Sequence, residues 1–237
     1  MVMLVLASNS PRRRQLLSLG GWNFIVLTSE VDESILPDES PVSYVRRLSL
    51  GKAEDVLHCL SSRNREGKLI IAADTAVVVQ KQKINSITGF QAKILGKPLD
   101  RYEAESMLRR LRARQHEVFT ALTVIRSVDE KVRTEVIKSI VTMRDFTDEE
   151  MLAYISSGDP LDKAGAYAIQ HTGFHPVVNF QGCYANVMGL PICQLSRLLT
   201  QFEVSAETSI PEACQEYLNY TCPIYHQVMQ QEGNFIG

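Results

Sequence analysis

The chain has 237 residues, of which 45% are hydrophobic and 22% charged, as is usual for a globular protein with a substantial core. Its formal net charge of -2 lacks the basic excess typical of nucleic-acid-binding proteins, so we expect no nucleic-acid partner. No stretch reaches the roughly 18 apolar residues that a membrane-spanning helix needs, and we expect no membrane partner.

Five cysteines are scattered along the chain without a CxxC pair. An odd number at irregular spacing suits reduced thiols better than a disulfide framework, so we expect a cytoplasmic protein. The N-terminal apolar run is short and its arginines follow it, unlike a signal peptide. Cys214, Cys222 and His226 could be imagined as zinc ligands, but their spacing matches no standard site, and small buried thiols are the favoured interpretation.

The first predicted elements are a strand, a helix and a second strand. Residues 2–7 form a short apolar run of the kind found in buried strands. Ser10 and Pro11 predict a helix start, because a hydroxyl suits the N-cap and proline costs nothing at the first helical position. The two glycines at 20–21 predict its end, and residues 24–27 predict the second strand.

A long amphipathic helix is predicted over residues 42–60. At 100° per residue its apolar side chains fall on one arc, and Lys52 lies inside that arc. A lysine on a buried helix face must extend its ammonium group to solvent or meet an anion.

A core strand is predicted over residues 69–73, ending at Asp74, with a further extended run over 76–79. The polar residues 80–94 predict a long hairpin tip. A helix is predicted next, over 102–111.

Two long alternating stretches, 118–125 and 132–143, predict a hairpin that turns near Asp129. Thr147 and Glu150 form a capping box ahead of another helix. Pro191 opens a later helix, and the composition becomes polar after Phe202. We therefore predict an α/β domain over residues 1–203, built in two lobes, and a C-terminal appendage over 204–237.

Residues 8–14, SNSPRRR, form the first candidate site. A strand leads into a serine-rich turn and then into a helix N-terminus, whose N–H groups and dipole suit phosphate. Arginine in the first helical turn opposes that dipole, so three in a row indicate another task, such as binding phosphate oxygens. The alternative is a solvated basic patch.

Asp74 forms the second candidate site, at the predicted end of an apolar strand. A carboxylate there is costly to desolvate unless it has a partner or a task, such as holding a metal or activating water. The alternative is an aspartate that caps a turn.

Lys52, Lys97, Asp32 and Glu33 form a third set. Lysines that converge with the arginines would neutralise a triphosphate of about four negative charges, and the carboxylates would hold a divalent cation. Taken singly, each is more often a solvated surface residue.

Residues 158–170, GDPLDKAGAYAIQ, combine a turn, the charged pair Asp162 and Lys163, and a predicted small-residue strand ending at Gln170. A glutamine at a strand end can read a base edge with its donor and its acceptor. Residues 186–191, NVMGLP, place a glycine turn before a helix.

Several other enzyme motifs are absent from the sequence: GxxxxGK[ST], HExxH and GxSxG do not occur. The five histidines have no ligand spacing to one another, and we interpret them as mostly structural.

Seven short motifs occur in an order that resembles the Maf family of nucleotide pyrophosphatases, which is historically linked to septum formation. The resemblance covers residues 4–203. The motifs are LASNSPRR at 6–13, VDE at 31–33, GKA at 51–53, ADT at 73–75, GKP at 96–98, DKAGAYAIQ at 162–170 and GLP at 189–191.

The resemblance implies a Maf/Ham1 (ITPase-like) fold: a mixed central β-sheet in two lobes, flanked by helices, with a deep cleft. It also implies hydrolysis of a nucleoside triphosphate to the monophosphate and pyrophosphate, with a divalent metal cation, Mg²⁺ or Mn²⁺, as cofactor.

The resemblance further implies roles for individual residues. Asp74 would activate the attacking water, and Asp74 and Glu33 would hold the metal. Lys52 and Lys97 complete the catalytic set. Substrate contacts would come from Ser8, Ser10, Arg12, Arg13, Thr75, Asp162, Lys163 and Gln170.

Three positions resemble the dTTP/UTP branch of the family: Arg12, Thr75 and Gln170. The branch similar to 7-methyl-GTP pyrophosphatases has tryptophan, glutamine and a Ser-Glu pair at those places. The chain departs from the family at Ala168 and His171, where glycine is usual, so the turn after Gln170 is expected to have less conformational freedom.

Two other functions stay open at this point. One is a nucleotide-binding regulator of cell division, which the same residues would serve, and which only turnover separates from an enzyme. The other is an interaction protein whose arginines dock an acidic partner. The sequence does not rank dTTP, UTP, CTP and modified pyrimidines, does not name the metal, and does not decide whether the chain forms a homodimer.

Overall fold

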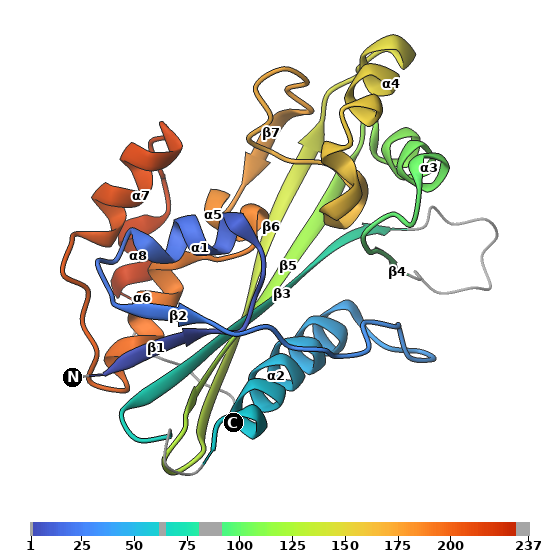
Figure 1. Cartoon of the computed structure of the whole chain (residues 1–237). Coiled ribbons are helices and arrows are strands. Elements are labelled where there is room, and N and C mark those ends of the chain that lie inside the picture. The colour runs from blue at the N-terminus through green and yellow to red at the C-terminus, as the bar shows by residue number, and fades with distance from the viewer. Residues whose placement is uncertain (1, 62–64, 81–91, 231–237) are drawn as a thin grey trace. The chain divides into compact units, whose positions relative to one another are not determined.

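The computed structural model describes residues 2–61, 65–80 and 92–230. These residues form a seven-stranded mixed sheet flanked by helices (Figure 1), in the order β2-β1-β3-β5-β6-β7, with β4 paired to β3. This confirms the predicted fold class. Within the described residues no helix is both long and apolar enough to cross a membrane.

The strands pair in both directions. β1 is parallel to both β2 and β3, whereas β4 is antiparallel to β3 and β7 is antiparallel to β6. The strands are β1 Met3–Leu6, β2 Phe24–Val26, β3 Lys68–Gln80, β4 Ala92–Leu95, β5 Gln115–Arg126, β6 Lys131–Met143 and β7 Val177–Gln181.

Most helices begin at the residues that the sequence indicates. Ser10 caps the first helix by accepting from the backbone N–H of Arg13, and the predicted capping box of Thr147 and Glu150 is confirmed. The α-helices are α1 Pro11–Ser18, α2 Pro41–Cys59, α3 Arg101–Leu111, α4 Asp148–Ser156, α5 Tyr184–Met188, α6 Ile192–Thr200, α7 Ile210–Leu218 and α8 Tyr225–Gln230.

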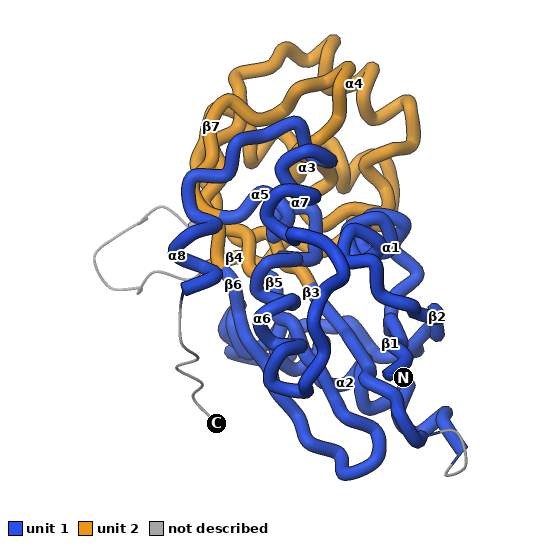
Figure 2. The backbone as a smooth tube through the Cα atoms, turned by 90° about the vertical axis from the view of Figure 1, so that its left-hand side faces the viewer, with its two compact units in different colours: residues 1–74, 120–137, 183–237 blue, residues 75–119, 138–182 orange. Residues whose placement is uncertain are grey.

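The chain divides into two compact units (Figure 2). Unit 1 consists of residues 1–74, 120–137 and 183–237, and unit 2 consists of 75–119 and 138–182. β3, β5 and β6 each contribute one end to each unit. The residues after 203 belong to unit 1.

One core cluster of unit 1 lies between α2 and the strands β1, β3 and β5. The apolar arc of α2 faces this core, as its periodicity predicts. The cluster consists of Val5, Ala7, Ala53, Val56, Leu57, Ile70, Ala72 and Ile125, all at most 4% exposed.

Two predictions about strands are wrong. β3 does not end at Asp74 but runs continuously through it. Residues 158–170 do not end in a strand: they form the short 3₁₀ turns η2 Asp159–Asp162 and η3 Ala164–Ala166. Gly165 has φ 69° and Ala166 has φ 60°, left-handed values outside the extended region that a regular strand requires.

The predicted hairpin tip over 80–94 is only partly tested. Residues 92–94 belong to β4 rather than to a tip, and residues 81–91 lie outside the described residues.

Candidate active site

Ser8 and Asp74 lie on neighbouring segments of unit 1. Ser8 follows the end of β1, and Asp74 lies within β3, which is parallel to β1. Leu6 of β1 pairs with Ile71 of β3, so the residues that follow each of them run side by side. Both polar side chains are buried, with Ser8 8% and Asp74 6% exposed. A carboxylate so far removed from water requires a compensating partner.

Lys52 of α2 is that partner. Its Nζ lies 2.6 Å from Asp74 Oδ1 and 2.6 Å from Glu33 Oε1. One turn earlier on α2, the hydroxyl of Ser49 contacts the carbonyl of Ala72 at 3.3 Å, which joins the helix to β3. The ammonium on the apolar face of α2 thus meets anions, one of the two outcomes expected from the sequence.

The segment that carries Glu33 is tied to the same helix. Tyr44 Oη donates to the carbonyl of Glu33 at 3.0 Å, and Arg47 Nη2 donates to the carbonyl of Ser34 at 2.9 Å. Arg47 also binds both carboxylate oxygens of Glu39, at 2.7 and 2.8 Å. Sequence reasoning missed Tyr44, although a tyrosine near the apolar arc of a helix signals a hydroxyl in need of a partner.

The turn before α1 is held by a small hydrogen-bond network. Ser8 Oγ accepts from the Ser10 N–H at 3.2 Å and from Arg13 Nη1 at 3.2 Å. Arg13 Nε donates to the carbonyl of Gly189 at 2.9 Å, so the NVMGLP motif orients this arginine. Gly189 has φ 106° as the left-handed cap of α5, a conformation that favours glycine.

Burial and neighbouring charges shift the pKa values of several residues in this group. Burial raises the pKa of Asp74, and the cations of Lys52 and Arg13 oppose that rise. Burial lowers the pKa of Arg13, opposed by Asp74. Burial, together with the carboxylates of Asp74 and Glu33, raises the pKa of Tyr44 to about 12. Two carboxylates and two cations therefore lie within electrostatic range of one another.

Glu33 and Asp74 fit a divalent metal when phosphate is also present. Their carboxylates converge on one ammonium group, and hard oxygen donors suit Mg²⁺, which typically takes one or two carboxylates plus substrate phosphates. Among the described residues, no group of three or more His, Cys, Asp or Glu could hold a metal by itself. Cys214, Cys222 and His226, all of which are described, do not form such a group.

In unit 2, Asp162 and Lys163 bind each other. Lys163 is buried, and its Nζ donates to Asp162 Oδ1 at 2.6 Å and to Asp159 Oδ1 at 2.9 Å. Tyr154 links this turn to the next segment: its hydroxyl donates to Asp159 Oδ2 at 2.8 Å and accepts from the Ala168 N–H at 3.1 Å.

Gln170 follows two residues later and is half-buried. His171, which stands where the family usually has glycine, packs edge-on against Tyr154 at 4.7 Å between ring centroids.

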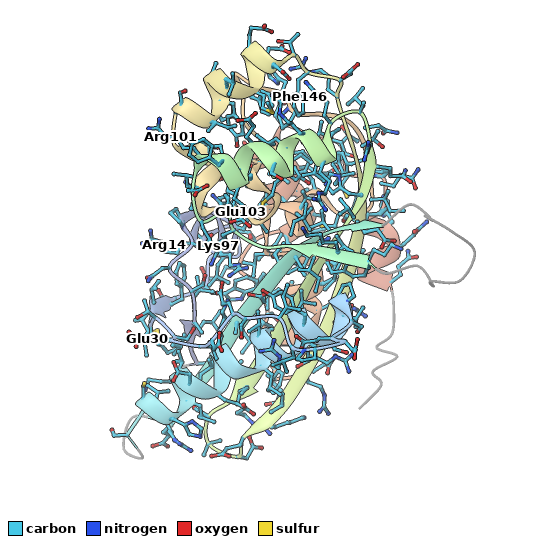
Figure 3. All side chains as sticks on the ribbon, turned by 90° about the vertical axis from the view of Figure 1, so that its right-hand side faces the viewer. Arg14, Glu30, Lys97, Arg101, Glu103 and Phe146 are labelled. Atoms are coloured by element: carbon cyan, nitrogen blue, oxygen red, sulfur yellow. The ribbon has the colours of Figure 1, made fainter. Side chains whose placement is uncertain are left out.

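Two further predicted residues also belong to unit 2. Lys97 is exposed in the turn between β4 and α3, as labelled in Figure 3, and the neighbouring carbonyl of Gly96 accepts from the Gly165 N–H at 3.0 Å. Thr75 is half-buried and directly follows Asp74 along β3.

A family model described as "Maf-like protein" matches residues 3–202. The chain is 41% identical over 192 residues to a dTTP/UTP pyrophosphatase of Geotalea uraniireducens (strain Rf4), covering 81% of this chain and 91% of the relative. It is 40% identical over 207 residues to a dTTP/UTP pyrophosphatase of Acetivibrio thermocellus, covering 86% and 98% of the two chains.

Two solved structures are also similar. The Ham1 protein of Staphylococcus aureus matches with a TM-score of 0.40 and 16% identity, covering 92% of this chain and 98% of that one. A HAM1 protein of Coxiella burnetii matches with a TM-score of 0.40 and 14% identity, covering 85% of this chain and 100% of that one. Likeness at this level supports no conclusion about activity.

Proposed function

Because the chain belongs to the Maf family, we propose that it is a nucleoside triphosphate pyrophosphatase that hydrolyses dTTP and UTP to the monophosphate and pyrophosphate. The relatives named above, at about 40% identity over most of both chains, carry the same activity in their names. The observation that carries the proposal is the ammonium of Lys52, which joins the buried Asp74 to Glu33 next to the Ser8–Arg13 network.

Asp74 acts as the general base. It accepts a proton from a water whose oxygen attacks the α-phosphorus, the bond from that phosphorus to the bridging oxygen breaks, and pyrophosphate leaves. A base of this kind must be ionised, and Lys52 and Arg13 favour the ionised form against the effect of burial. Arg13 thereby serves both water activation and phosphate binding.

The turn before α1 binds the phosphates. Ser8 and Ser10 offer hydroxyl groups at the start of the helix, and Arg13 is pre-oriented by the carbonyl of Gly189. Arg12 and Lys97 add positive charge. A divalent cation, Mg²⁺ or Mn²⁺, held by Asp74 and Glu33 with the phosphates, would neutralise negative charge on the phosphate oxygens.

Base selectivity comes from Thr75, Gln170 and Arg12. Gln170 can both donate to and accept from a pyrimidine edge. Asp162 and Lys163 contribute by fixing the turn that leads to Gln170, because they pair with each other.

We place the enzyme in the cytoplasm, where it removes pyrimidine triphosphates from the nucleotide pool. None of the five cysteines, all of which lie among the described residues, forms a disulfide. That is consistent with a reducing compartment.

The test is incubation of the purified protein with a panel of nucleoside triphosphates and Mg²⁺ or Mn²⁺, with separate detection of pyrophosphate and orthophosphate. We expect pyrophosphate from dTTP and UTP, and a rate at least ~100-fold lower for Asp74→Asn, as the loss of a general base implies. The matched control is Asp145→Asn, because Asp145 is an exposed aspartate of unit 2.

Each other outcome argues against one part of the proposal. Orthophosphate as the first product would mean that a different bond is cleaved. Nucleotide binding without turnover would favour the regulator of cell division instead.

A further inference from the structure

The residues after 203 contact the phosphate-binding helix directly. The family match ends at residue 202, yet the described residues 204–230, here called the C-terminal extension, form α7 and α8 within unit 1. Figure 1 shows the red α7 beside the blue α1.

Four hydrogen bonds join the C-terminal extension to α1 and the turn after it. Two of them are accepted by carbonyls directly after the helix: Thr208 Oγ1 donates to the carbonyl of the C-cap residue Leu19 at 2.6 Å, and the Glu207 N–H donates to that of Gly20 at 3.0 Å. The other two are Trp22 Nε1 to the Ser205 carbonyl at 2.9 Å and Tyr217 Oη to Gln15 Oε1 at 3.0 Å.

The turn after α1 is shaped for this contact. A Cβ at Gly20 would lie 2.2 Å from the ring of Trp22, so only glycine leaves room for that buried indole. Gly21 has φ 72°, and a Cβ there would lie 2.9 Å from the Cβ of Glu207. Trp22, which donates to the C-terminal extension, therefore leaves no space for a side chain at Gly20, and Glu207 of the extension leaves none at Gly21.

α1 has little stability of its own. It is eight residues long, its first turn has three arginines and no acidic residue, and its last turn has no basic residue. The arginines interact unfavourably with the positive N-terminal end of the helix dipole, and its last turn offers no cation to stabilise the negative C-terminal end. Helices this short are also only marginally stable in water. The C-terminal extension adds two hydrogen bonds directly after the helix, to the carbonyls of the C-cap residue Leu19 and of Gly20.

We propose that the C-terminal extension is a positioning element for the phosphate-binding turn. By holding the C-terminal end of α1, it fixes the orientation of the first turn, where Arg12 and Arg13 lie. This inference rests on the proposed phosphate-binding role of that turn. Thr208, Trp22 and Tyr217 act through α1 and are positioning residues, not catalytic ones.

The test uses the full chain with three changes that each remove one of these donors: Thr208→Val and Tyr217→Phe, which nearly keep side-chain size, and Trp22→Phe, which keeps an aromatic ring. We expect KM for dTTP to rise about fivefold to twentyfold with kcat within twofold, as loss of binding made equally in ground and transition states implies. Amide hydrogen exchange of residues 16–20 should accelerate by at least about tenfold. The single variant Thr208→Ser, which keeps the hydroxyl, should retain the wild-type KM and exchange rates, whereas Thr208→Val should alter both in the same direction as the triple variant.

The matched control is Thr200→Val. Thr200 Oγ1 donates to the carbonyl of Arg197 at 2.8 Å in the last turn of α6, so the same change there removes a threonine hydroxyl that is bonded within its own helix. Unchanged KM in the triple variant, unchanged exchange in α1, or an equal effect of Thr200→Val would overturn the proposal. If the wild type cleaves no triphosphate, the proposed function fails, and hydrogen exchange still decides whether the C-terminal extension stabilises α1.

Discussion

Lys52 and Asp74 form a buried ion pair, with Nζ 2.6 Å from Oδ1 and the two side chains 10% and 8% exposed. The attraction within such a pair roughly offsets the cost of taking both charges out of water, so its contribution to folding stability is small. Its effect on ionisation is larger, because burial raises the pKa of Asp74 and Lys52 is the strongest of the groups that oppose this rise.

Replacing Lys52 by methionine should therefore change the pH dependence of catalysis. Without the ammonium, burial and Glu33 both raise the pKa of Asp74, so the acid limb of kcat/KM moves to higher pH. At neutral pH we expect a loss of at least about tenfold, to be measured as kcat/KM between pH 5 and 9. Lys131→Met is the control. An acid limb that stays in place, or moves to lower pH, would refute this role.

The same variant should alter stability with pH. A carboxyl whose folded pKa is raised binds a proton more readily in the folded state, so stability is greatest below its unfolded pKa and falls as pH rises through the folded pKa. Urea midpoints of Lys52→Met should therefore decline more steeply with rising pH than those of the wild type, over the range from the ordinary aspartate pKa upward. An equal slope for both proteins would contradict the prediction.

Tyr44→Phe should loosen the segment that carries Glu33. The change removes one buried hydroxyl that donates to the Glu33 carbonyl and leaves the ring in place. We expect kcat/KM to fall about threefold to tenfold, the size of one hydrogen bond. Because the Glu33 carboxylate raises the pKa of Asp74, the acid limb should shift slightly to lower pH. Tyr102→Phe, on an exposed tyrosine, should change neither quantity.

Gly165→Ala should destabilise the protein, whereas Gly96→Ala should not. Gly165 has φ 69°, and a Cβ there would lie 2.9 Å from both Cγ atoms of Val77. No atom lies within 4 Å of a Cβ built at Gly96. We expect a loss of about 1–3 kcal/mol for the first variant, measured by urea unfolding. Similar unfolding midpoints for the two variants would show that the left-handed turn tolerates a side chain.

Gln170→Ala should weaken discrimination between bases. If its amide reads the pyrimidine edge, the ratio of kcat/KM for dTTP to that for ATP should fall at least about tenfold. Gln181→Ala, on an exposed glutamine of β7 in the same unit, is the control. A uniform fall for all bases would assign Gln170 to general binding rather than to selectivity.

Local signals in the sequence predicted much of unit 1. The cap at Ser10 and the periodicity of α2 both depend on neighbouring residues, so one sequence was enough to find them, and Lys52 was identified because its charge interrupted an apolar face. The continuation of β3 through Asp74 was not predictable in this way. The carboxylate is tolerated within the strand because Lys52, 22 residues earlier, compensates it.

The left-handed turn at Gly165 was missed for a related reason. AGAYAI has the composition of a small-residue strand, and only its contact with Val77 and Gly96 shows why the backbone must turn there. The role of Gly189 in orienting Arg13 depends on a pairing 176 residues apart. Tertiary contacts of this kind leave no trace in local periodicity.

The three-part composition of unit 1 has a consequence for biosynthesis. Unit 2 consists of residues 75–119 and 138–182, whereas unit 1 combines residues 1–74 with residues 120–137 and 183–237. The hydrogen bond from Arg13 to Gly189 forms only after Gly189 has been synthesised. The bond from Trp22 likewise requires Ser205, 183 residues later. At ~5–20 residues per second, translation leaves β1 and α1 without these partners for roughly 10–40 s. A nascent chain therefore cannot complete the hydrogen bonds that hold the turn before α1 and the turn after it until Gly189 and Ser205 have been synthesised.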